Sequence, residues 1–331
     1  MAAVLKTVGI ISSSGHTGGE LIRLLSKHPD VKLSAVSSES KEKEDILEAH
    51  PFLQKSFSGK FVSGNVKNFI DCDLVFIAAS AENQTFGIVN ELLEAGVKIV
   101  DMTSTFRVPV KDSKASKNKN LMSAIYGIPE INRKNIKKAK LVANPGCMAT
   151  ACILCAYPLT NAGLVERVIL DCKIGLSAAG SQPSPRTHYP AAFQSVYGYE
   201  KHPHRHYPEI LANLKIKTHF FPQLVPISRG ILCSAYFIVK PKTSITELVD
   251  SYNMYSKDFF IRTTKSPPST TLVKGSNFCD IGGFFLEDDL FAVSSALDNL
   301  GKGGAGQAIQ NMNLMLGFEE SSGLKDAPTY P

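Results

Sequence analysis

The sequence predicts an α/β fold of two domains, in which a doubly wound parallel sheet precedes an α+β domain. Over residues 1–146, short apolar runs typical of strands alternate with helical segments, and this alternation favours parallel strands joined by right-handed crossovers. From residue 147 onward, longer strand-like runs and Pro-rich loops indicate a mixed or antiparallel sheet. A chain of 331 residues with 44% hydrophobic content is long enough for about two domains.

The expected elements follow this division. A helix that begins near Glu20 and ends before Pro29 would bury one apolar face, formed by Leu21, Ile22, Leu24 and Leu25. A second helix is expected at Thr85–Leu93, and a surface loop at Lys111–Asn120. We expect strands at Thr7–Ile11, Val31–Val36, Asp73–Ala79 and Lys98–Met102, and in the second domain at Val168–Leu176, Ile231–Lys240 and Leu290–Leu297.

The last helical pattern, Ala305–Leu316, follows the second domain and is expected to pack back on the first. The predicted first domain therefore comprises residues 1–146, completed by a C-terminal helix at 302–331. The predicted second domain, for catalysis and oligomerisation, comprises residues 147–301.

Charge and cysteine content narrow the possible functions. The 36 basic and 30 acidic residues leave a net charge of +6, a mild excess that suits an anionic substrate or an acidic partner. The sequence has no basic stripe interleaved with aromatic residues, so nucleic acid binding is not expected. It also lacks an apolar run of about 18 residues, and its 7 cysteines show no paired spacing. We therefore expect a cytoplasmic protein without a membrane partner.

A Gly-rich turn, S-S-S-G-H-T-G-G, joins the first expected strand to the first helix. In a Rossmann-type domain, such a turn lets the backbone reach the pyrophosphate of a dinucleotide at the helix N-terminus. Gly15 and Gly18 fit the second and third glycines of that pattern, whereas Ser12 stands at the first. A flexible loop could show the same partial match, but its position between strand and helix favours a dinucleotide site.

The residues after the second strand bear on the choice of dinucleotide. Ser37 and Ser38 stand where NAD-binding domains usually carry an acidic residue for the ribose 2′-OH, which favours NADP(H). Glu39 would repel a 2′-phosphate, so NADP and NAD both remain open.

Cys147 is the candidate nucleophile. It follows a short apolar run, Pro145 and Gly146, at the expected start of a helix. A helix N-terminus favours a thiolate, and the thiolate attacks a carbonyl carbon more readily than the thiol does. The alternative interpretation is a small buried apolar residue.

Three histidines, His202, His204 and His206, alternate along H-P-H-R-H-Y-P-E-I. A metal site is one interpretation, but Cys152 and Cys155 are expected inside a buried helix, so we expect no metal. A catalytic imidazole that exchanges a proton near neutral pH is favoured. The basic residues that could recognise a phosphate or carboxylate, or form structural ion pairs instead, are Arg107, Arg205, Arg229 and Lys173.

With these residues placed, the chain resembles the N-acetyl-gamma-glutamyl-phosphate reductase family along nearly its whole length. The matching blocks, in order, are S-S-G-H-T-G-G-E-L-I-R-L-L, D-M-T-S-T-F-R, Y-G-I-P-E-I, A-N-P-G-C, K-I-G-L-S-A-A-G, H-R-H-Y-P-E-I, L-V-P-I-S-R-G-I, G-S-N-F and D-N-L-G-K-G-G-A-G-Q-A-I-Q-N-M-N. The family is similar in fold and chemistry to aspartate-semialdehyde and glyceraldehyde-3-phosphate dehydrogenases, which agrees with the two-domain prediction.

The resemblance implies an NADPH-dependent reduction of an acyl phosphate to a semialdehyde through a thioester on Cys147. His206 is the implied acid/base, with His204 as the second choice. Asn299 matches the residue that holds the nicotinamide. The residues implied to place the substrate are Arg107, Asn144 and Arg205. The positions implied for NADP(H) are Ser14, Gly15, His16, Thr17, Gly18, Ser37, Ser38 and Glu39.

Several positions depart from the family pattern without removing the nucleophile or the acid/base. Ser12 replaces a glycine and Glu39 replaces a frequent arginine, and both bear on the cofactor. The other departures are His16 for tyrosine, Met148-Ala149 for Tyr-Pro, Ala178 for glycine and Gln223 for histidine.

The blocking group on the substrate amine separates two branches of the family. S-Q-P-S-P-R-T-H-Y-P and N-P-G-C-M-A-T-A resemble the branch that reduces 2-aminoadipyl or glutamyl phosphate attached to a small acidic amino-group carrier protein, in lysine or arginine biosynthesis. H-R-H-Y-P-E-I and L-V-P-I-S-R-G-I favour the free acetylated substrate of arginine biosynthesis. We place the carrier branch slightly ahead.

Two other hypotheses remain open, an inactive NADP-binding regulator and a dehydrogenase acting on aspartyl phosphate. The resemblance also implies a homodimer or homotetramer.

Overall fold

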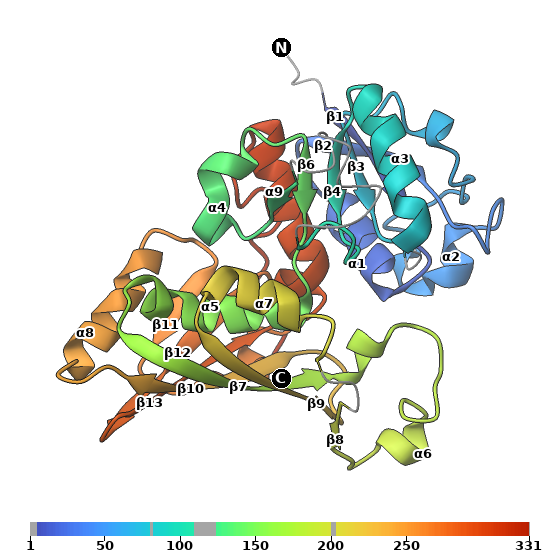
Figure 1. Cartoon of the computed structure of the whole chain (residues 1–331). Helices are drawn as coiled ribbons and strands as arrows, with labels where there is room; N and C mark the ends of the chain where they lie inside the picture. The colour runs from blue at the N-terminus through green and yellow to red at the C-terminus, as the bar shows by residue number, and fades with distance from the viewer. Residues whose placement is uncertain (1–4, 80–81, 109–123, 200–202, 331) are drawn as a thin grey trace. The chain divides into compact units, whose positions relative to one another are not determined.

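The computed structural model describes residues 5–79, 82–108, 124–199 and 203–330 (Figure 1). The expected loop Lys111–Asn120 lies outside these residues. The chain divides into two compact units. Unit 1 comprises Met1–Pro145 and Gly304–Lys325, and unit 2 comprises Gly146–Gly303 and Asp326–Pro331.

Unit 1 is built on a six-stranded parallel sheet with the order β2-β1-β3-β4-β6-β5. Strands are added on both sides of β1, which confirms the predicted doubly wound sheet. The two strands at one end of this order, β6 and β5, were not predicted, because apolar runs this short show no clear two-residue alternation. The strands are β1 (Lys6–Ile11), β2 (Val31–Val36), β3 (Leu74–Ile77), β4 (Lys98–Asp101), β5 (Ile125–Tyr126) and β6 (Leu141–Ala143).

Helix α1 (His16–Leu25) begins directly after the Gly-rich turn, about one turn earlier than expected, with Gly15 as its N-cap. Its apolar face is buried as predicted. The other helical segments of this part of the chain are α2 (Ile46–Ala49), η1 (Pro51–Leu53), η2 (Val66–Asn68), α3 (Glu82–Glu94) and α4 (Pro129–Ile136).

The C-terminal helix α9 (Gly306–Leu316) belongs to unit 1 and follows a π-helical turn at Gly301–Ala305. Gly317 ends α9 in the left-handed conformation (φ 81°), which glycine adopts without strain. The prediction of a helix over 302–331 was therefore too long, since turns and irregular chain follow Leu316.

Polar side chains of α9 hold it in the core of unit 1. Gln307 Nε2 and Asn311 Nδ2 both donate to the Gly127 carbonyl, at 2.7 and 2.9 Å. Gly127 must be glycine here, because an added Cβ would lie 2.5 Å from the Asn311 amide nitrogen. The helix thus joins unit 1 through specific hydrogen bonds as well as through apolar packing.

Unit 2 contains a seven-stranded mixed sheet with the order β11-β12-β13-β10-β7-β9-β8. The β7–β9 and β11–β12 pairs are parallel, and the other pairs are antiparallel, which confirms the α+β prediction. The strands are β7 (Val165–Gly175), β8 (Tyr197–Gly198), β9 (Lys217–Val225), β10 (Ile231–Val239), β11 (Ile261–Thr264), β12 (Cys279–Glu287) and β13 (Leu290–Leu297).

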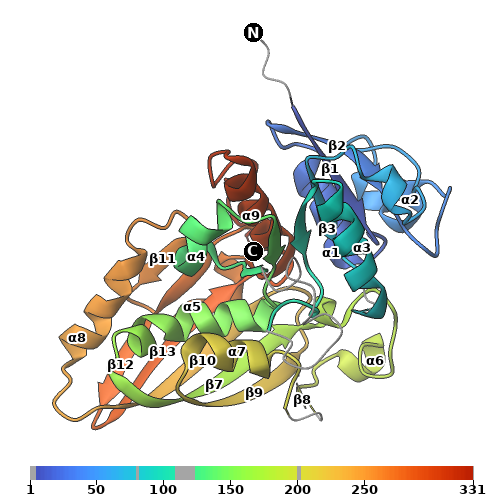
Figure 2. The same cartoon turned by 45° about the horizontal axis from the view of Figure 1, so that its top comes forward.

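Helix α5 (Cys147–Asn161) packs on β7, β10 and β13, with α7 (Tyr207–Leu214) beside it on the same side of the sheet (Figures 1 and 2). The middle of α5 is buried, and Cys152 and Cys155 both lie in it, as predicted. Shorter helical segments of this unit are η5 (Leu176–Ala179), α6 (Tyr189–Ala192), α8 (Ile245–Asp250), η6 (Ser251–Tyr255) and η7 (Thr270–Leu272). Among the described residues, no helix combines the length and apolar character needed to cross a membrane.

Side chains alternate between the two faces of this sheet, and the face opposite the buried side chains carries large exposed apolar groups. They come from four strands and comprise Ile169, Phe221, Tyr236 and Phe285. Such a patch on a sheet face is typical of a protein–protein interface.

We predict that protonation of His28 destabilises unit 1. The Asp30 N–H donates to His28 Nδ1 at 3.2 Å, so the ring proton lies on Nε2, which is 3.1 Å from Asn313 Oδ1 on α9. Burial lowers the pKa of His28 from 6.5, and the Asn313 hydrogen bond and the Asp30 charge only partly oppose this. The stabilisation is complete above pH 6.5 and is lost as the pH falls through the lowered pKa.

Urea unfolding at several pH values tests this prediction. Over that window, one group contributes a slope of at most about 1.4 kcal/mol per pH unit to the free energy of unfolding. His28→Gln keeps a donor but does not titrate, so the variant should lose less stability than the wild type between pH 7.5 and 5.5. Equal losses would contradict the prediction.

Candidate active site

Cys147 is the first residue of α5, and Gly146 caps the helix in an extended conformation (φ −68°, ψ 145°). No side chain caps this end, so backbone N–H groups of the first turn face the region of the thiol. Cys147 is half-buried, whereas the other six cysteines are buried. The structure therefore gives Cys147 both the exposure and the helix N-terminus that the sequence predicts for a nucleophile.

His206 and Glu209, which begin α7, pack directly on the backbone of Gly146. The Gly146 N–H donates to Glu209 Oε2 at 3.2 Å, and Glu209 Oε1 lies 4.0 Å from His206 Nε2. A Cβ at position 146 would lie 2.4 Å from His206 Nε2 and 2.6 Å from Glu209 Oε1. Both side chains are almost fully buried, at 2% and 1% exposure. One carboxylate thus contacts both the start of the nucleophile's helix and the imidazole.

His204 supports His206 from the other side. Its Nδ1 accepts a hydrogen bond from the His206 backbone N–H at 3.1 Å, so Nδ1 carries no proton. The two rings meet edge to face at 4.8 Å between centroids, and Tyr199 packs on His204 in the same way at 4.9 Å. This geometry suits His204 for orienting its neighbour and His206 for proton transfer, an assignment that stays a prediction.

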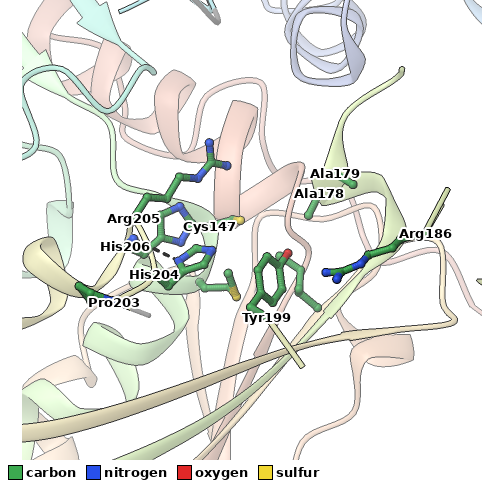
Figure 3. Close-up of a pocket in the computed structure, with 11 residues that line it drawn as sticks. Cys147, Ala178, Ala179, Arg186, Tyr199, Pro203, His204, Arg205 and His206 are labelled. Carbon is green, nitrogen blue, oxygen red and sulfur yellow. Dashed lines mark hydrogen bonds between the residues drawn. The ribbon is translucent and has the colours of Figure 1, made fainter. Parts of the chain in front are cut away.

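A cavity of about 640 Å³ opens beside these residues, a size that suits a small molecule. Figure 3 shows Cys147, His204 and His206 on one side of it, while Arg186 points in from the other side towards Tyr199. Arg205 also lines the cavity, but its side chain extends away from Tyr199 and Arg186 (Figure 3). The remaining lining residues are Met148, Ile174, Ala178, Ala179 and Pro203.

Three residues of this site were not found by sequence reasoning, namely Arg186, Tyr199 and Glu209. No helix was predicted after His206. With one, Glu209 could have been found, because a spacing of three residues on a helix places its side chain beside that of His206. Arg186 and Tyr199 lie in a segment with no clear period. Burial, and next the charge of Cys147, raise the pKa of Tyr199, so its hydroxyl stays protonated and can donate to a ligand.

Two of the candidate cations form ion pairs instead. Arg229 Nε lies 2.9 Å from the buried Asp298 Oδ2, and Asp298 also accepts the Gly275 N–H at 2.6 Å. Lys173 pairs with Asp171 at 2.6 Å. These contacts favour the structural interpretation of both cations.

Asn299 lies next to this ion pair in the chain. Its Oδ1 accepts the Gly230 N–H at 2.8 Å, and its Nδ2 donates to Ser177 Oγ at 2.9 Å. The side chain is thereby fixed between two loops of unit 2. Its predicted contact with the nicotinamide stays a prediction.

In unit 1, the Gly-rich turn has the conformation that the glycine pattern requires. Ser12 adopts φ 61°, which costs an L-residue about 1–2 kcal/mol, so a glycine would fit this position without strain. A Cβ on Gly18 would lie 2.1 Å from the Ser13 carbonyl oxygen. Around Gly15, an added Cβ would meet no atom within 4 Å, so the backbone here is open to a ligand.

The residues predicted to bind a dinucleotide gather around this turn. Ser37 Oγ accepts the Ser12 N–H at 3.2 Å, and the buried Ser38 Oγ has no hydrogen-bond partner, as expected for a group that awaits a ligand. The exposed Glu39 follows them at the end of β2. Ser14, His16 and Thr17 lie at the start of α1. The strained turn, the open backbone and the orphaned hydroxyl together fit a dinucleotide.

Arg107 and Asn144 also lie in unit 1, where internal contacts hold both. Arg107 Nε donates to the Asn144 carbonyl and Nη2 to the Met102 carbonyl, each at 2.9 Å. Asn144 is buried, and its Oδ1 accepts from Asn311 Nδ2 at 3.0 Å. These contacts support a structural role, and substrate binding by either residue stays a prediction.

The structure also bears on the metal hypothesis. His202 lies outside the described residues, so the histidine run can be judged only from His204 and His206. The Sγ atoms of Cys152, Cys172 and Cys233 lie within 4.8 Å of one another in the core. Burial raises the pKa of Cys152, whereas hydrogen bonds with Cys152 and Cys233 outweigh burial at Cys172 and lower its pKa to about 6. All three thiols are buried in the core, and the expectation that they hold no metal stays a prediction.

Comparisons with known proteins agree with this geometry. Residues 7–139 match the family model "Semialdehyde dehydrogenase, NAD binding domain", and residues 147–299 match "Semialdehyde dehydrogenase, dimerisation domain". An N-acetyl-gamma-glutamyl-phosphate reductase of Archaeoglobus fulgidus is 43% identical over 98% of this chain and 99% of its own. The chain belongs to the N-acetyl-gamma-glutamyl-phosphate reductase family.

The reductase family membership makes this protein an oxidoreductase with an NAD(P)-binding domain. A second reductase, from Methanosphaera stadtmanae, is 42% identical over 98% of both chains. Among solved structures, aspartate semialdehyde dehydrogenase with NADP from Candida albicans has a TM-score of 0.76 at 16% identity, over 95% of this chain and 99% of that chain. That likeness confirms the fold. Neither reductase is named for a carrier-linked substrate, so the leaning towards the carrier branch finds no support here.

We predict that Gly146→Ala lowers kcat/KM by at least about a hundredfold, because a displacement of about 1 Å in a catalytic group has this effect. The new Cβ would displace His206 or Glu209 from the start of α5. The control is Gly87→Ala on α3, where a Cβ meets no atom within 4 Å. Steady-state kinetics and circular dichroism on both variants test this, and a folded Gly146→Ala enzyme with wild-type kcat/KM would refute it.

Proposed function

We propose that this protein reduces N-acetyl-gamma-glutamyl phosphate to its semialdehyde with NADPH, in arginine biosynthesis. The placement of Cys147 and His206 at one cavity, with Glu209 Oε1 4.0 Å from His206 Nε2, carries the proposal. The relatives' names support the free acetylated substrate, which therefore replaces the carrier-linked substrate as our first choice.

Acylation begins with attack of the Cys147 thiolate on the acyl carbon of the substrate. The N–H groups at the start of α5 favour the thiolate and the negative charge that develops on the carbonyl oxygen. The carbon–sulfur bond forms as the bond to phosphate breaks, and His206 gives the departing phosphate a proton. Glu209 lies close enough to stabilise the imidazolium form of His206 before this transfer.

Bound NADPH supplies the hydride that reduces the thioester. The Gly15 backbone and the Ser38 hydroxyl are suited to hold its pyrophosphate and ribose. After reduction, the carbon–sulfur bond breaks, the oxygen forms the aldehyde carbonyl and Cys147 leaves as the thiolate. His204 keeps His206 oriented throughout, through the bond to its backbone N–H.

The substrate carries a carboxylate and a phosphate, and the cavity offers positive charge to both. Arg186 and Arg205 line it, and guanidinium groups bind both anions well. The Tyr199 hydroxyl can donate a further hydrogen bond. We assign substrate binding to these three residues.

The same proposal includes a homodimer or homotetramer. The exposed patch of Ile169, Phe221, Tyr236 and Phe285 lies in the unit that matches the dimerisation domain, and a second copy would remove it from water. It also includes a reducing, cytoplasmic setting, because the mechanism needs Cys147 as a free thiolate.

The deciding experiment is phosphate-dependent reduction of NADP by the purified protein with N-acetylglutamate semialdehyde. We expect turnover, and we expect Cys147→Ser to lower kcat by more than about a thousandfold, since the nucleophile makes the covalent bond. Parallel reactions use carrier-linked glutamate and aminoadipate semialdehydes and aspartate semialdehyde. Activity confined to a carrier-linked aldehyde would overturn the proposed substrate, and full activity of Cys147→Ser would overturn the mechanism.

We further predict that Glu39→Arg shifts the cofactor preference towards NADPH. Glu39 is exposed at the end of β2, where its charge opposes a 2′-phosphate, and arginine would attract the same group. The ratio of kcat/KM for NADPH to that for NADH should rise about tenfold, equivalent to about 1.4 kcal/mol. Glu39→Gln is the matched control and should give a smaller rise. An unchanged ratio in both variants would place the 2′-phosphate elsewhere.

A further inference from the structure

We propose that His50 is a positioning residue for the dinucleotide, which acts by holding the carbonyl of Ser13 in the Gly-rich turn. The inference rests on the proposed use of NADPH. It concerns a residue outside the turn in sequence, at the end of α2 and just before η1.

The central contact is a hydrogen bond between His50 Nε2 and the Ser13 carbonyl oxygen, at 2.8 Å. A carbonyl oxygen only accepts, so Nε2 carries the ring proton and donates it. His50 is 3% exposed, which removes water as a competitor for this carbonyl. The bond therefore fixes the Ser13 peptide from a buried side of the turn.

The turn needs support at this place. Ser12, directly before Ser13, has φ 61°, a conformation that a non-glycine residue holds only when its surroundings impose it. On the other side of the turn, the Ser13 N–H and hydroxyl both donate to the Ser37 carbonyl, at 2.8 and 2.9 Å. Ser37 holds the donors of Ser13, and His50 holds its acceptor.

The Ser13 carbonyl also packs against the first turn of α1. The carbonyl oxygen lies so close to Gly18 that a Cβ there would be 2.1 Å away. A movement of Ser13 would therefore change its packing against the first turn of α1. The backbone N–H groups of that turn are the ones expected to bind the pyrophosphate.

His50 itself is rigidly held. A Cβ on Gly19 would lie 2.7 Å from His50 Nδ1, so the ring rests against the backbone of α1. Phe52 and Phe61 flank the ring edge to face, with centroids at 5.8 and 6.3 Å. Burial lowers the pKa of His50, and the hydrogen bond to Ser13 opposes this less strongly, so the imidazole is neutral at pH 7. The packed imidazole ring can therefore hold the Ser13 carbonyl in the position that dinucleotide binding requires.

Three substitutions test the proposal. His50→Leu keeps apolar bulk but removes the donor, whereas the terminal amide of His50→Gln can donate to Ser13 in place of Nε2. Ser12→Gly relaxes the turn and should reduce its need for His50. The Kd for NADPH is measured by fluorescence, followed by KM for NADPH and by kcat at saturating NADPH.

We expect His50→Leu to raise Kd and KM for NADPH about tenfold, the effect of losing about 1.4 kcal/mol. His50 is not proposed to contact the Cys147 thiolate or the nicotinamide, so kcat should change less than about threefold. His50→Gln should restore most of the affinity. In the Ser12→Gly background, the effect of His50→Leu should be smaller than in the wild type, which a double-mutant cycle measures.

Equal weakening by Leu and Gln would show that only the ring's packing matters, and would overturn the proposal. So would an unchanged Kd in His50→Leu, or a loss confined to kcat. If His50→Leu does not fold, His50→Asn, whose amide is too short to reach Ser13, replaces it in the comparison with His50→Gln. Wild-type protein that binds no NADPH would overturn the proposed function as well, whereas tight wild-type binding with an unaffected His50→Leu variant would overturn this inference alone.

Discussion

The hydrogen bond from the Gly146 N–H to Glu209 is the contact on which the proposed catalytic arrangement depends. It joins the N-cap of α5, directly before Cys147, to the first turn of α7, whose N-cap is His206. The absence of a side chain at position 146 lets the imidazole and the carboxylate approach this backbone. A second glycine, Gly303, allows the same closeness on another side, where a Cβ would lie 2.9 Å from the Cys147 Cβ. Cys147, the proposed nucleophile, is thus positioned by backbone packing.

In unit 1, glycines likewise allow close packing, here around the predicted dinucleotide site. The Ser13 carbonyl lies against Gly18, and the ring of His50 lies against Gly19, so two consecutive glycines of α1 accept neighbours that any side chain would displace. The two glycines lose more conformational entropy on folding than other residues would. Ser12 in addition adopts a strained backbone conformation. In return, the turn and the helix N-terminus are rigid before a cofactor arrives, and a preorganised site loses less free energy on binding.

The sequence was most informative where chemistry and local pattern coincide. Cys147 after Pro-Gly, the alternation of strands and helices and the longer strands beyond it predicted the fold class and the candidate nucleophile. Glu209 would have been within reach of an argument from helical spacing only if a helix had been predicted directly after His206. Arg186, Tyr199 and His50 were not, because irregular segments carry them and only tertiary structure brings them to their partners. The overlong helix at 302–331 had a similar cause, since Gly317 ends α9 through a backbone conformation that a hydrophobic pattern does not reveal.

The charge of the molecule can be understood without an acidic protein partner. A net charge of +6 suits either an anionic substrate or an acidic partner, and two of the positive groups, Arg186 and Arg205, line the cavity beside Cys147. A small substrate with a carboxylate and a phosphate needs cations of this kind close to the reacting carbon, where they also favour its encounter with the enzyme. Charges placed for a carrier protein would instead have to extend over a surface large enough for a protein interface. The cavity's two arginines therefore account for part of this charge through a substrate with a carboxylate and a phosphate, and no protein partner is needed to explain their position.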